Sequence, residues 1–275
     1  MVDNSLKYII ICVSALLLCF LVGGLTVRTF FKNRNIKNRK TKITAVTIIA
    51  TVVFYALLML VYLSVYYHAD DQAQIAIAGN DNVNVTKIDN ALYFDGCGDE
   101  CAIIFYGGAK VESTSYAPLM LKLAESGFDC FLIKMPFNFA LFGGNAADEL
   151  VENYQYDSWL MAGHSMGGIV ASSYAEKHTD KIDGIILLAS YPTIPISQNL
   201  KLCSIYGSLD GCLDTDEYEK SKVNWPNEST EFVIEGGNHA QFANYGKQSG
   251  DNDALISSEK QQEETVKKIA EYFSK

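Results

Sequence analysis

Residues 163–167 read Gly-His-Ser-Met-Gly, between an apolar stretch (SWLMA) and a run of small and aliphatic residues that favours a helix. When a strand turns directly into a helix, glycines on either side of the apex let the two backbones approach closely, and the apex side chain projects outward. The pentapeptide alone is a weak signal, and this setting strengthens it. Ser165 is the candidate nucleophile, and the amide of Met166, at the start of the helix, is a candidate oxyanion donor.

A serine hydroxyl needs a base to take its proton. Among the four histidines, His68 borders an apolar segment, His164 is the neighbour of the serine, and His178 lies near the expected end of a helix. Only His239 directly follows an expected strand, in EGGNHAQF, where two glycines permit a tight turn. We therefore predict His239 as the general base, with a solvated loop histidine as the alternative.

The base in turn needs an acid that orients it. Asp210 lies just past an expected strand in SIYGSLDGC, and Asp214 and Asp216 are close competitors. We prefer Asp210 because the other two begin a helical stretch, where acidic residues interact favourably with the helix dipole.

A second glycine pair ends another apolar stretch, IIFYGGAKV. Because its backbone can approach a ligand closely, we expect the second oxyanion donor there, at the amide of Gly108, with Gly107 and Ala109 as alternatives. An ordinary glycine turn is the simpler interpretation.

The stretch MPFNFALFGGN is too apolar for a fully solvated loop, and it follows a strand that ends at Lys134. Functional groups collect at the strand ends of such sheets, so this stretch should fall near the nucleophile. Phe137, Phe139 and Phe142 are therefore candidates for an acyl pocket. Packing against the sheet or against a bilayer is an equally good interpretation.

The elements that must position these residues alternate between strands and helices. Such alternation predicts the α/β class, with a mostly parallel sheet, helices on both faces and an antiparallel hairpin at one edge. The expected strands are a hairpin at 83–96 with its turn at Asp89-Asn90, and CAIIFYGG, FDCFLIKMP, SWLMAG, GIILLAS, LKLCSIYG and EFVIEGG; the expected helices follow Ser113, cover AADELVENY, and run from Gly167 to Lys177 and from about Ser258 to Phe273.

Two uncharged apolar segments, about 8–27 and 43–67, each reach the roughly 20 residues that a helix needs to cross hydrocarbon. The segment between them, 28–42, holds seven Lys and Arg and no acidic residue. The positive-inside rule places this loop in the cytoplasm, so the rest of the chain should lie on the extracytoplasmic side of the cell membrane. A cleaved signal peptide fits poorly, because only Lys7 precedes the first segment and basic residues follow it.

We therefore divide the chain into a membrane anchor at 1–68 with two transmembrane helices, a linker at 69–84 and one catalytic domain at 85–275. The anchor carries a net charge of +7 and the remainder −17, within a total of −10. An acidic outer domain argues against nucleic acid as a partner. The expected partners are the lipid bilayer and a small-molecule or lipid-like acyl substrate.

Five of the seven cysteines lie beyond the anchor. Two pairs are close enough in sequence to form disulfides outside the cell, and a reduced, buried set is an equal alternative. The pairs are Cys97 with Cys101 and Cys203 with Cys212, and Cys130, in an apolar run, should be a buried thiol. No histidine or acidic cluster accompanies the cysteines at metal-ligand spacing, so we expect no metal site.

Residues 85–275 resemble the serine α/β-hydrolase superfamily, and more narrowly a compact, lidless bacterial subgroup. The resemblance rests on YGGAKVESTSYAPLMLKLAESGFDCFLIKMPFN, AGHSMGG, SIYGSLDG and EGGNHAQFANYG, and on the chain order of the three candidates. It implies the α/β-hydrolase fold, with Ser165 as nucleophile, His239 as general base and then acid, Asp210 orienting His239, and no cofactor. Tyr106 departs from the pattern, because many relatives have histidine or proline before the glycines; this departure concerns the choice of oxyanion donor.

Three functions follow from this reading. The first is hydrolysis of a carboxylic ester or a related acyl bond through an acyl-enzyme. The second is acyl transfer to another alcohol at the cell envelope, which would use the same residues. The third is a binding or sensing protein on a hydrolase scaffold, and the presence of all three candidate residues argues against it.

Overall fold

The computed structural model describes residues 14, 17–25, 27–29 and 39–273. The chain divides into two compact units, residues 1–65 and residues 66–275, which we describe separately.

Among the described residues of the first unit, one helix, α2 (Arg39–Ser64), is long and apolar enough to cross a membrane. Most of its apolar side chains are exposed, as a lipid-facing helix requires. The hydroxyls of Thr44 and Thr47 donate to the carbonyls of Lys40 and Ile43, so these polar groups are satisfied within the helix.

Helix α2 corresponds to the second predicted span, 43–67. The prediction of two transmembrane helices is not confirmed. Much of the first predicted span, 8–27, lies outside the described residues, and the part that is described belongs to a shorter apolar helix, Leu17–Thr29. Residues 30–38 of the predicted basic loop also lie outside the described residues.

The second unit is built around an eight-stranded sheet with the order β1-β2-β4-β3-β5-β6-β7-β8. The hairpin β1-β2 and its pairing with β4 are antiparallel, and all other neighbours are parallel, so the predicted architecture is confirmed. The strands are β1 (Asn84–Ile88), β2 (Ala91–Asp95), β3 (Cys101–Tyr106), β4 (Asp129–Ile133), β5 (Ser158–His164), β6 (Gly184–Leu188), β7 (Lys201–Gly207) and β8 (Ser229–Ile234).

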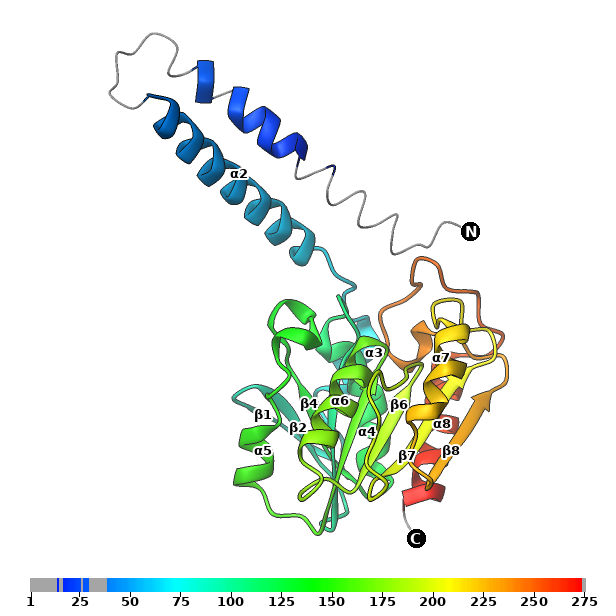
Figure 1. Cartoon of the computed structure of the whole chain (residues 1–275). Coiled ribbons are helices and arrows are strands. Elements are labelled where there is room, and N and C mark those ends of the chain that lie inside the picture. The colour runs from blue at the N-terminus through cyan, green and yellow to red at the C-terminus, as the bar shows by residue number, and fades with distance from the viewer. Residues whose placement is uncertain (1–13, 15–16, 26, 30–38, 274–275) are drawn as a thin grey trace. The chain divides into compact units, whose positions relative to one another are not determined.

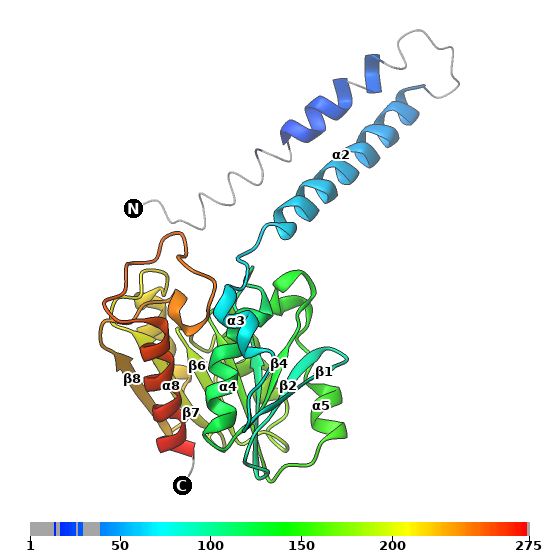
Figure 2. The same cartoon turned by 180° about the vertical axis from the view of Figure 1, so that it is seen from behind.

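Helices cover both faces of the sheet (Figures 1 and 2). Helices α4 and α8 lie on one face, with α3 beside α4, and α5 and α6 lie on the other. The helices of this unit are α3 (Asp71–Ala76), α4 (Ala117–Glu125), α5 (Asp148–Asn153), α6 (Met166–Lys177), α7 (Thr215–Ser221) and α8 (Ser258–Phe273), with short 3-10 turns at Ser113–Tyr116, Pro136–Asn138, Ala140–Phe142, Lys222–Asn224 and Ala240–Phe242.

Alternating strand residues supply two separate hydrophobic cores. In β3, Ile103 and Phe105 join the core beneath α4 and α8, whereas Ile104 and Tyr106 join the core beneath α5 and α6. All four are buried, because successive side chains of a strand point to opposite faces and both faces are covered. Burial on both faces explains why the residues of β3 form a continuous apolar run in the sequence.

The segment predicted as a linker, 69–84, contains an ordered helix, α3. Asp70 caps α3 by accepting from the amide of Ala73, and the Asp70 amide donates to the carbonyl of Asn244. Just before it, Tyr67 forms a parallel bridge with Val111. The segment from residue 66 onward is thus part of the second unit.

The cysteines of the second unit are all free thiols in the structure, so neither predicted disulfide is formed. Cys203 is fully buried within β7, and burial raises the pKa of its thiol to about 12. Cys130 is fully buried, as predicted.

Candidate active site

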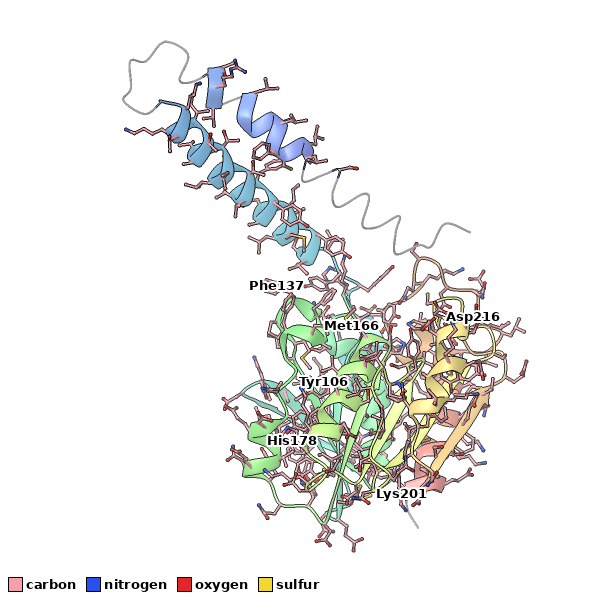
Figure 3. All side chains as sticks on the ribbon, in the orientation of Figure 1. Tyr106, Phe137, Met166, His178, Lys201 and Asp216 are labelled. Carbon is pink, nitrogen blue, oxygen red and sulfur yellow. The ribbon has the colours of Figure 1, made fainter. Side chains whose placement is uncertain are left out.

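The candidate residues meet at one edge of the sheet, where the parallel strands end. Strands β3 and β5 are neighbours although β4 lies between them in the sequence, so the chain order reverses there, and ligands bind at such points. In Figure 3, Met166 and Phe137 lie at this end of the second unit, and Lys201, which begins β7, lies at the opposite end.

The turn between β5 and α6 holds Ser165 in a strained backbone conformation. Its φ of 53° and ψ of −125° are unusual for any residue other than glycine. A side chain at Gly163 would overlap the backbone of Gly167, and one at Gly167 would overlap the carbonyl of Tyr106. Both glycines of the motif are therefore required by close backbone packing, as predicted.

Ser190, two residues past the end of the neighbouring strand β6, supports this turn. Its buried hydroxyl donates to the carbonyl of Ser165 at 2.6 Å, and the Ser165 amide donates to the carbonyl of Leu188 at 2.9 Å. A side chain at Gly168 would come within 2.5 Å of the Ser190 hydroxyl, so this position also needs glycine.

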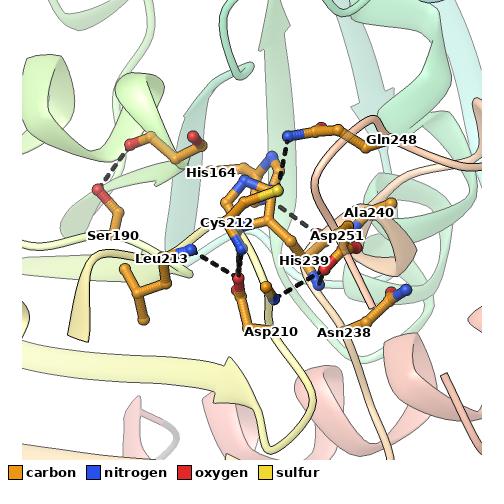
Figure 4. Close-up of polar contacts among 12 residues, drawn as sticks. His164, Ser190, Asp210, Cys212, Leu213, Asn238, His239, Ala240, Gln248 and Asp251 are labelled. Carbon is orange, nitrogen blue, oxygen red and sulfur yellow. Dashed lines mark hydrogen bonds and ion pairs between the residues drawn. The ribbon is translucent and has the colours of Figure 1, made fainter. Parts of the chain in front are cut away.

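His239 and Asp210 form a buried pair at the ends of β8 and β7 (Figure 4). The Nδ1 of His239 lies 2.9 Å from one carboxylate oxygen of Asp210 and 3.2 Å from the other. Their side chains are 4% and 2% exposed. The amides of Cys212 and Leu213 donate to Asp210 Oδ1 at 2.8 and 2.7 Å. These two donors stabilise the carboxylate, which can then hold the His239 ring with Nδ1 protonated.

The competing acids have other contacts. Asp214 caps α7 by accepting from the amide of Glu217 at 3.0 Å, and Asp216 lies in the first turn of the same helix. Both serve the helix terminus, as the sequence suggested.

Two residues that the sequence did not single out hold the His239 loop. The carboxylate of Asp251 accepts from the amides of Ala240 (2.9 Å), Gly211 (2.9 Å) and His239 (3.3 Å), and so joins the two loops that carry the pair. The buried amide of Gln261, in α8, bonds to both the N–H and the carbonyl of Asn238. Neither position has a local signal, because each acts on a segment ten or more residues away.

His164, the neighbour of the serine, belongs to a buried hydrogen-bond chain. Its Nδ1 lies 2.9 Å from the hydroxyl of Tyr116, and its Nε2 lies 3.1 Å from the carbonyl of His239. Burial, and then the nearby His239, hold the pKa of His164 well below its usual value. The ring is therefore neutral, with Nε2 donating to the carbonyl and Nδ1 accepting from the phenol.

The same chain corrects the predicted oxyanion donor. The amide of Gly108 donates to the Tyr116 hydroxyl at 2.8 Å, so this N–H is already used inside the protein. The amides of Ala109 and Met166 have no hydrogen-bond partner among the described residues. The loop that contains Gly107 and Gly108, the glycine loop, packs against the start of α6. A side chain at Gly167 would lie 2.5 Å from the Gly107 carbonyl. Gly107 and Ala109, the two alternatives from the sequence, stay candidates for the second donor.

Of the three predicted acyl-pocket residues, Phe137 and Phe142 are exposed and Phe139 is half-buried. Phe137 and Phe142 are 53% and 57% exposed, and Phe139 packs on Phe142 with ring centroids 5.8 Å apart. Phe137 also lines a cavity of about 470 Å³ between the β1-β2 hairpin and the loop after β4, and neither Ser165 nor His239 lines that cavity. An acyl pocket formed by these side chains around the serine therefore stays a prediction.

The structure brings Ser165, His239 and Asp210 to the same sheet edge, and joins the last two by a hydrogen bond. The Ser165 hydroxyl itself has no hydrogen-bond partner among the described residues, and neither has Nε2 of His239. Hydrogen bonds of a catalytic site are often long or absent before substrate binds.

A family model described as "Alpha/beta hydrolase family" matches residues 102–263, which are more than half of the chain. The chain belongs to this family. The matched region contains all three candidate residues, and family membership supports a hydrolase. A search of the curated proteins found no significant match.

Solved structures of the same fold include proteins from several organisms. A predicted CIB-like hydrolase from Thermoplasma acidophilum is 14% identical, with a TM-score of 0.51, covering 69% of this chain and 98% of that one. Dienelactone hydrolase from Anabaena variabilis is 13% identical, with a TM-score of 0.51, covering 70% and 98%. An epoxide hydrolase mutant from Vigna radiata is 11% identical, with a TM-score of 0.52, covering 71% and 99%. At these identities the likeness shows the fold alone.

Proposed function

We propose that this protein is a membrane-anchored serine hydrolase that cleaves a carboxylic ester or a related acyl bond. The observation that carries the proposal is the strained backbone of Ser165, which presents a half-buried hydroxyl at the sheet edge where His239 and Asp210 form their pair. Strain of this kind persists only where surrounding structure enforces it, and it is concentrated at functional sites.

In the proposed reaction, the Ser165 hydroxyl turns to Nε2 of His239, which takes its proton as the oxygen attacks the acyl carbonyl. Asp210 holds Nδ1–H and stabilises the imidazolium that forms. The imidazolium then protonates the leaving group, which departs and leaves an acyl-enzyme on Ser165. A water molecule activated by His239 hydrolyses this ester, and the free serine is restored.

The negative charge that develops on the carbonyl oxygen needs donors that are not already bonded. The amide of Met166 lies at the first position of α6, where the helix dipole also favours an anion. The amide of Ala109 would supply the second donor. Gly108 would contribute indirectly, because its bond to Tyr116 fixes the loop that carries Ala109.

The anchor in this proposal is α2, whose length and composition suit a membrane span. The basic residues before it favour a cytoplasmic start and an extracytoplasmic catalytic domain. An ester of the lipid phase or of the cell envelope would then be within reach of the active site.

The test is hydrolysis of p-nitrophenyl esters of increasing chain length by the full-length chain in detergent, with mass spectrometry of the quenched enzyme. We expect a burst of p-nitrophenol and an acyl adduct on Ser165, both absent from Ser165→Ala. A folded wild-type chain without burst or adduct would reject the mechanism. An added alcohol acceptor distinguishes the acyltransferase alternative, because ester product would then exceed free acid.

A further inference from the structure

The aromatic loop, residues 136–142, exposes three large apolar side chains within six residues. Phe137, Leu141 and Phe142 are 53%, 61% and 57% exposed. The rings of Phe137 and Phe142 lie 6.1 Å apart, edge to face, and Phe139 packs on Phe142, so the side chains form one cluster. Contiguous exposed apolar groups of this kind mark an interaction surface.

The backbone of the aromatic loop holds this cluster outward. Phe137 and Asn138 have φ values of 55° and 53°, a left-handed conformation that two successive residues other than glycine rarely adopt. The Asn138 amide donates to the carbonyl of Met135 at 3.1 Å, and Ala140, in the middle of the loop, is fully buried. The surrounding structure therefore enforces the exposure of Phe137 rather than merely permitting it.

The aromatic loop is tied to the segment that follows the membrane helix. The amide of Lys110 donates to the carbonyl of Asn138 at 2.7 Å, and the carbonyl of Lys110 accepts from the amide of Tyr67 at 2.7 Å. Tyr66 and Phe137 line the same cavity. One residue thus joins the loop to the beginning of the second unit.

The covalent chain limits how far Tyr67, which bonds to Lys110 beside the aromatic loop, can lie from the end of α2. The helix ends at Ser64, and the three residues from there to Tyr67 span at most about 10 Å when fully extended. This limit holds for any orientation of the two units. If α2 crosses the membrane, the aromatic loop lies within reach of the interfacial layer, where aromatic and aliphatic side chains are stabilised.

We propose that the aromatic loop is a docking surface for the lipid bilayer, and that Phe137, Leu141 and Phe142 enter the interfacial layer. This inference rests on the proposed anchoring by α2. The loop contacts Lys110, which follows the candidate oxyanion donor Ala109, so docking also keeps the active-site edge of the sheet at the lipid surface. Acyl lipids are the substrate class that this placement favours.

The experiment uses the full-length chain in phosphatidylcholine vesicles that contain a phosphatidylcholine with a diazirine on its acyl chain. After irradiation, lipid adducts are mapped by mass spectrometry of peptides. We expect adducts on α2 and on the aromatic loop, with the yield on the loop roughly ten-fold above that on peptides containing Val223 or Leu255. These two residues are matched controls, because they are 88% and 82% exposed and lie outside the aromatic loop.

A pair of double variants sharpens the test. Phe137→Ser with Phe142→Ser should lower the adduct yield on the loop several-fold, whereas Val223→Ser with Leu255→Ser should leave it unchanged. All four side chains are exposed, so neither variant should lower the thermal unfolding temperature by much.

Each result separates the two proposals. Adducts on α2 without adducts on the aromatic loop would overturn the docking surface and leave the anchor in place. A chain without adducts on α2 would overturn the anchor, and the docking surface with it. Fluorophosphonate labelling of Ser165 in the same vesicles reports on the proposed catalysis independently of either result.

Discussion

Two histidine rings lie beside each other at the candidate site, with centroids 4.5 Å apart, and they differ in what their nitrogens contact. His239 places Nδ1 against the carboxylate of Asp210 and leaves Nε2 without a partner among the described residues. His164 has both nitrogens occupied by neutral groups, the hydroxyl of Tyr116 and the carbonyl of His239. A carboxylate stabilises an imidazolium, whereas buried neutral dipoles leave the ring uncharged.

The difference shows that closeness in sequence to the serine does not make a histidine the base. His164 is adjacent to Ser165 in the chain, yet its ring bonds to the carbonyl of His239 and, through the Tyr116 hydroxyl, is linked to the amide of Gly108. We interpret His164 as a positioning residue and His239 as the catalytic base. Variants of the two histidines and of their hydrogen-bond partners test that division of roles.

Replacement of His239 by alanine should remove the proposed base and lower kcat for a p-nitrophenyl ester by about 10⁴-fold or more. His164→Asn keeps a polar group in the buried chain, and it should lower kcat by only about ten-fold, with KM nearly unchanged. Steady-state kinetics of the two variants measures the contrast. An equal fall in kcat in the two variants would contradict the assignment of His239 as the base and His164 as a positioning residue.

Asp210→Asn should lower kcat by on the order of 10³-fold, because an amide cannot stabilise the imidazolium and can hold the ring in the wrong tautomer. Asp214→Ala is the matched control, since it removes a carboxylate four residues away that only caps α7. It should cost about 1 kcal/mol of unfolding free energy and leave kcat alone. If Asp214→Ala proved as slow as Asp210→Asn, the assignment of the acid would be wrong.

Tyr116→Phe would break the buried chain at its centre and leave Gly108 N–H and His164 Nδ1 without partners. We expect a loss of about 1–3 kcal/mol in unfolding free energy, measured by urea denaturation, and a fall in kcat of roughly ten-fold. Tyr218→Phe removes a buried hydroxyl whose one side-chain partner among the described residues is Ser204, and it should leave kcat unchanged. Unchanged kcat in Tyr116→Phe would show that the chain stabilises the fold without positioning the site.

The charge state of His164 predicts a pH effect on stability. Its pKa is lowered in the folded protein, so below about pH 6.5, the ordinary histidine pKa, the unfolded chain binds a proton that the folded chain does not. The contribution of neutral His164 to the unfolding free energy is therefore fully present above that pH. It is lost as pH falls, by about 1 kcal/mol per pH unit. Urea denaturation of the wild type and of His164→Asn at pH 7.5 and 5.5 gives the unfolding free energy at each pH. This free energy should fall less between the two pH values in the variant than in the wild type. An equal decrease in both would contradict a neutral His164.

The sequence predicted the strands, the edge hairpin, the elbow glycines and the positions of Ser165, Asp210 and His239, because these features depend on local patterns. An apolar run between turn signals predicts a buried strand. A polar loop directly after such a strand is predicted to lie at the carboxyl ends of the parallel strands, where functional groups collect. Asp214 could be assigned to its helix for the same reason, since capping acts over three residues.

The rest depended on contacts between distant segments. Tyr116 reaches the Gly108 amide and His164, and Asp251 joins the loops of Asp210 and His239, although none of these partners is near in sequence. The sequence of α3 gives no helix signal, because only six residues are helical and the stability of this helix comes from packing on the second unit. Nor does the sequence show that a tyrosine hydroxyl accepts the N–H of Gly108, the predicted oxyanion donor.

The most direct test of the proposed site is labelling of the full-length chain with a fluorophosphonate probe, followed by mass spectrometry of the modified residue. We predict one adduct, on Ser165, in the wild type and more slowly in His164→Asn, and none in His239→Ala or Ser165→Ala. Labelling that persists in His239→Ala, or a folded wild-type chain that does not react at Ser165, would contradict a serine hydrolase with His239 as its base.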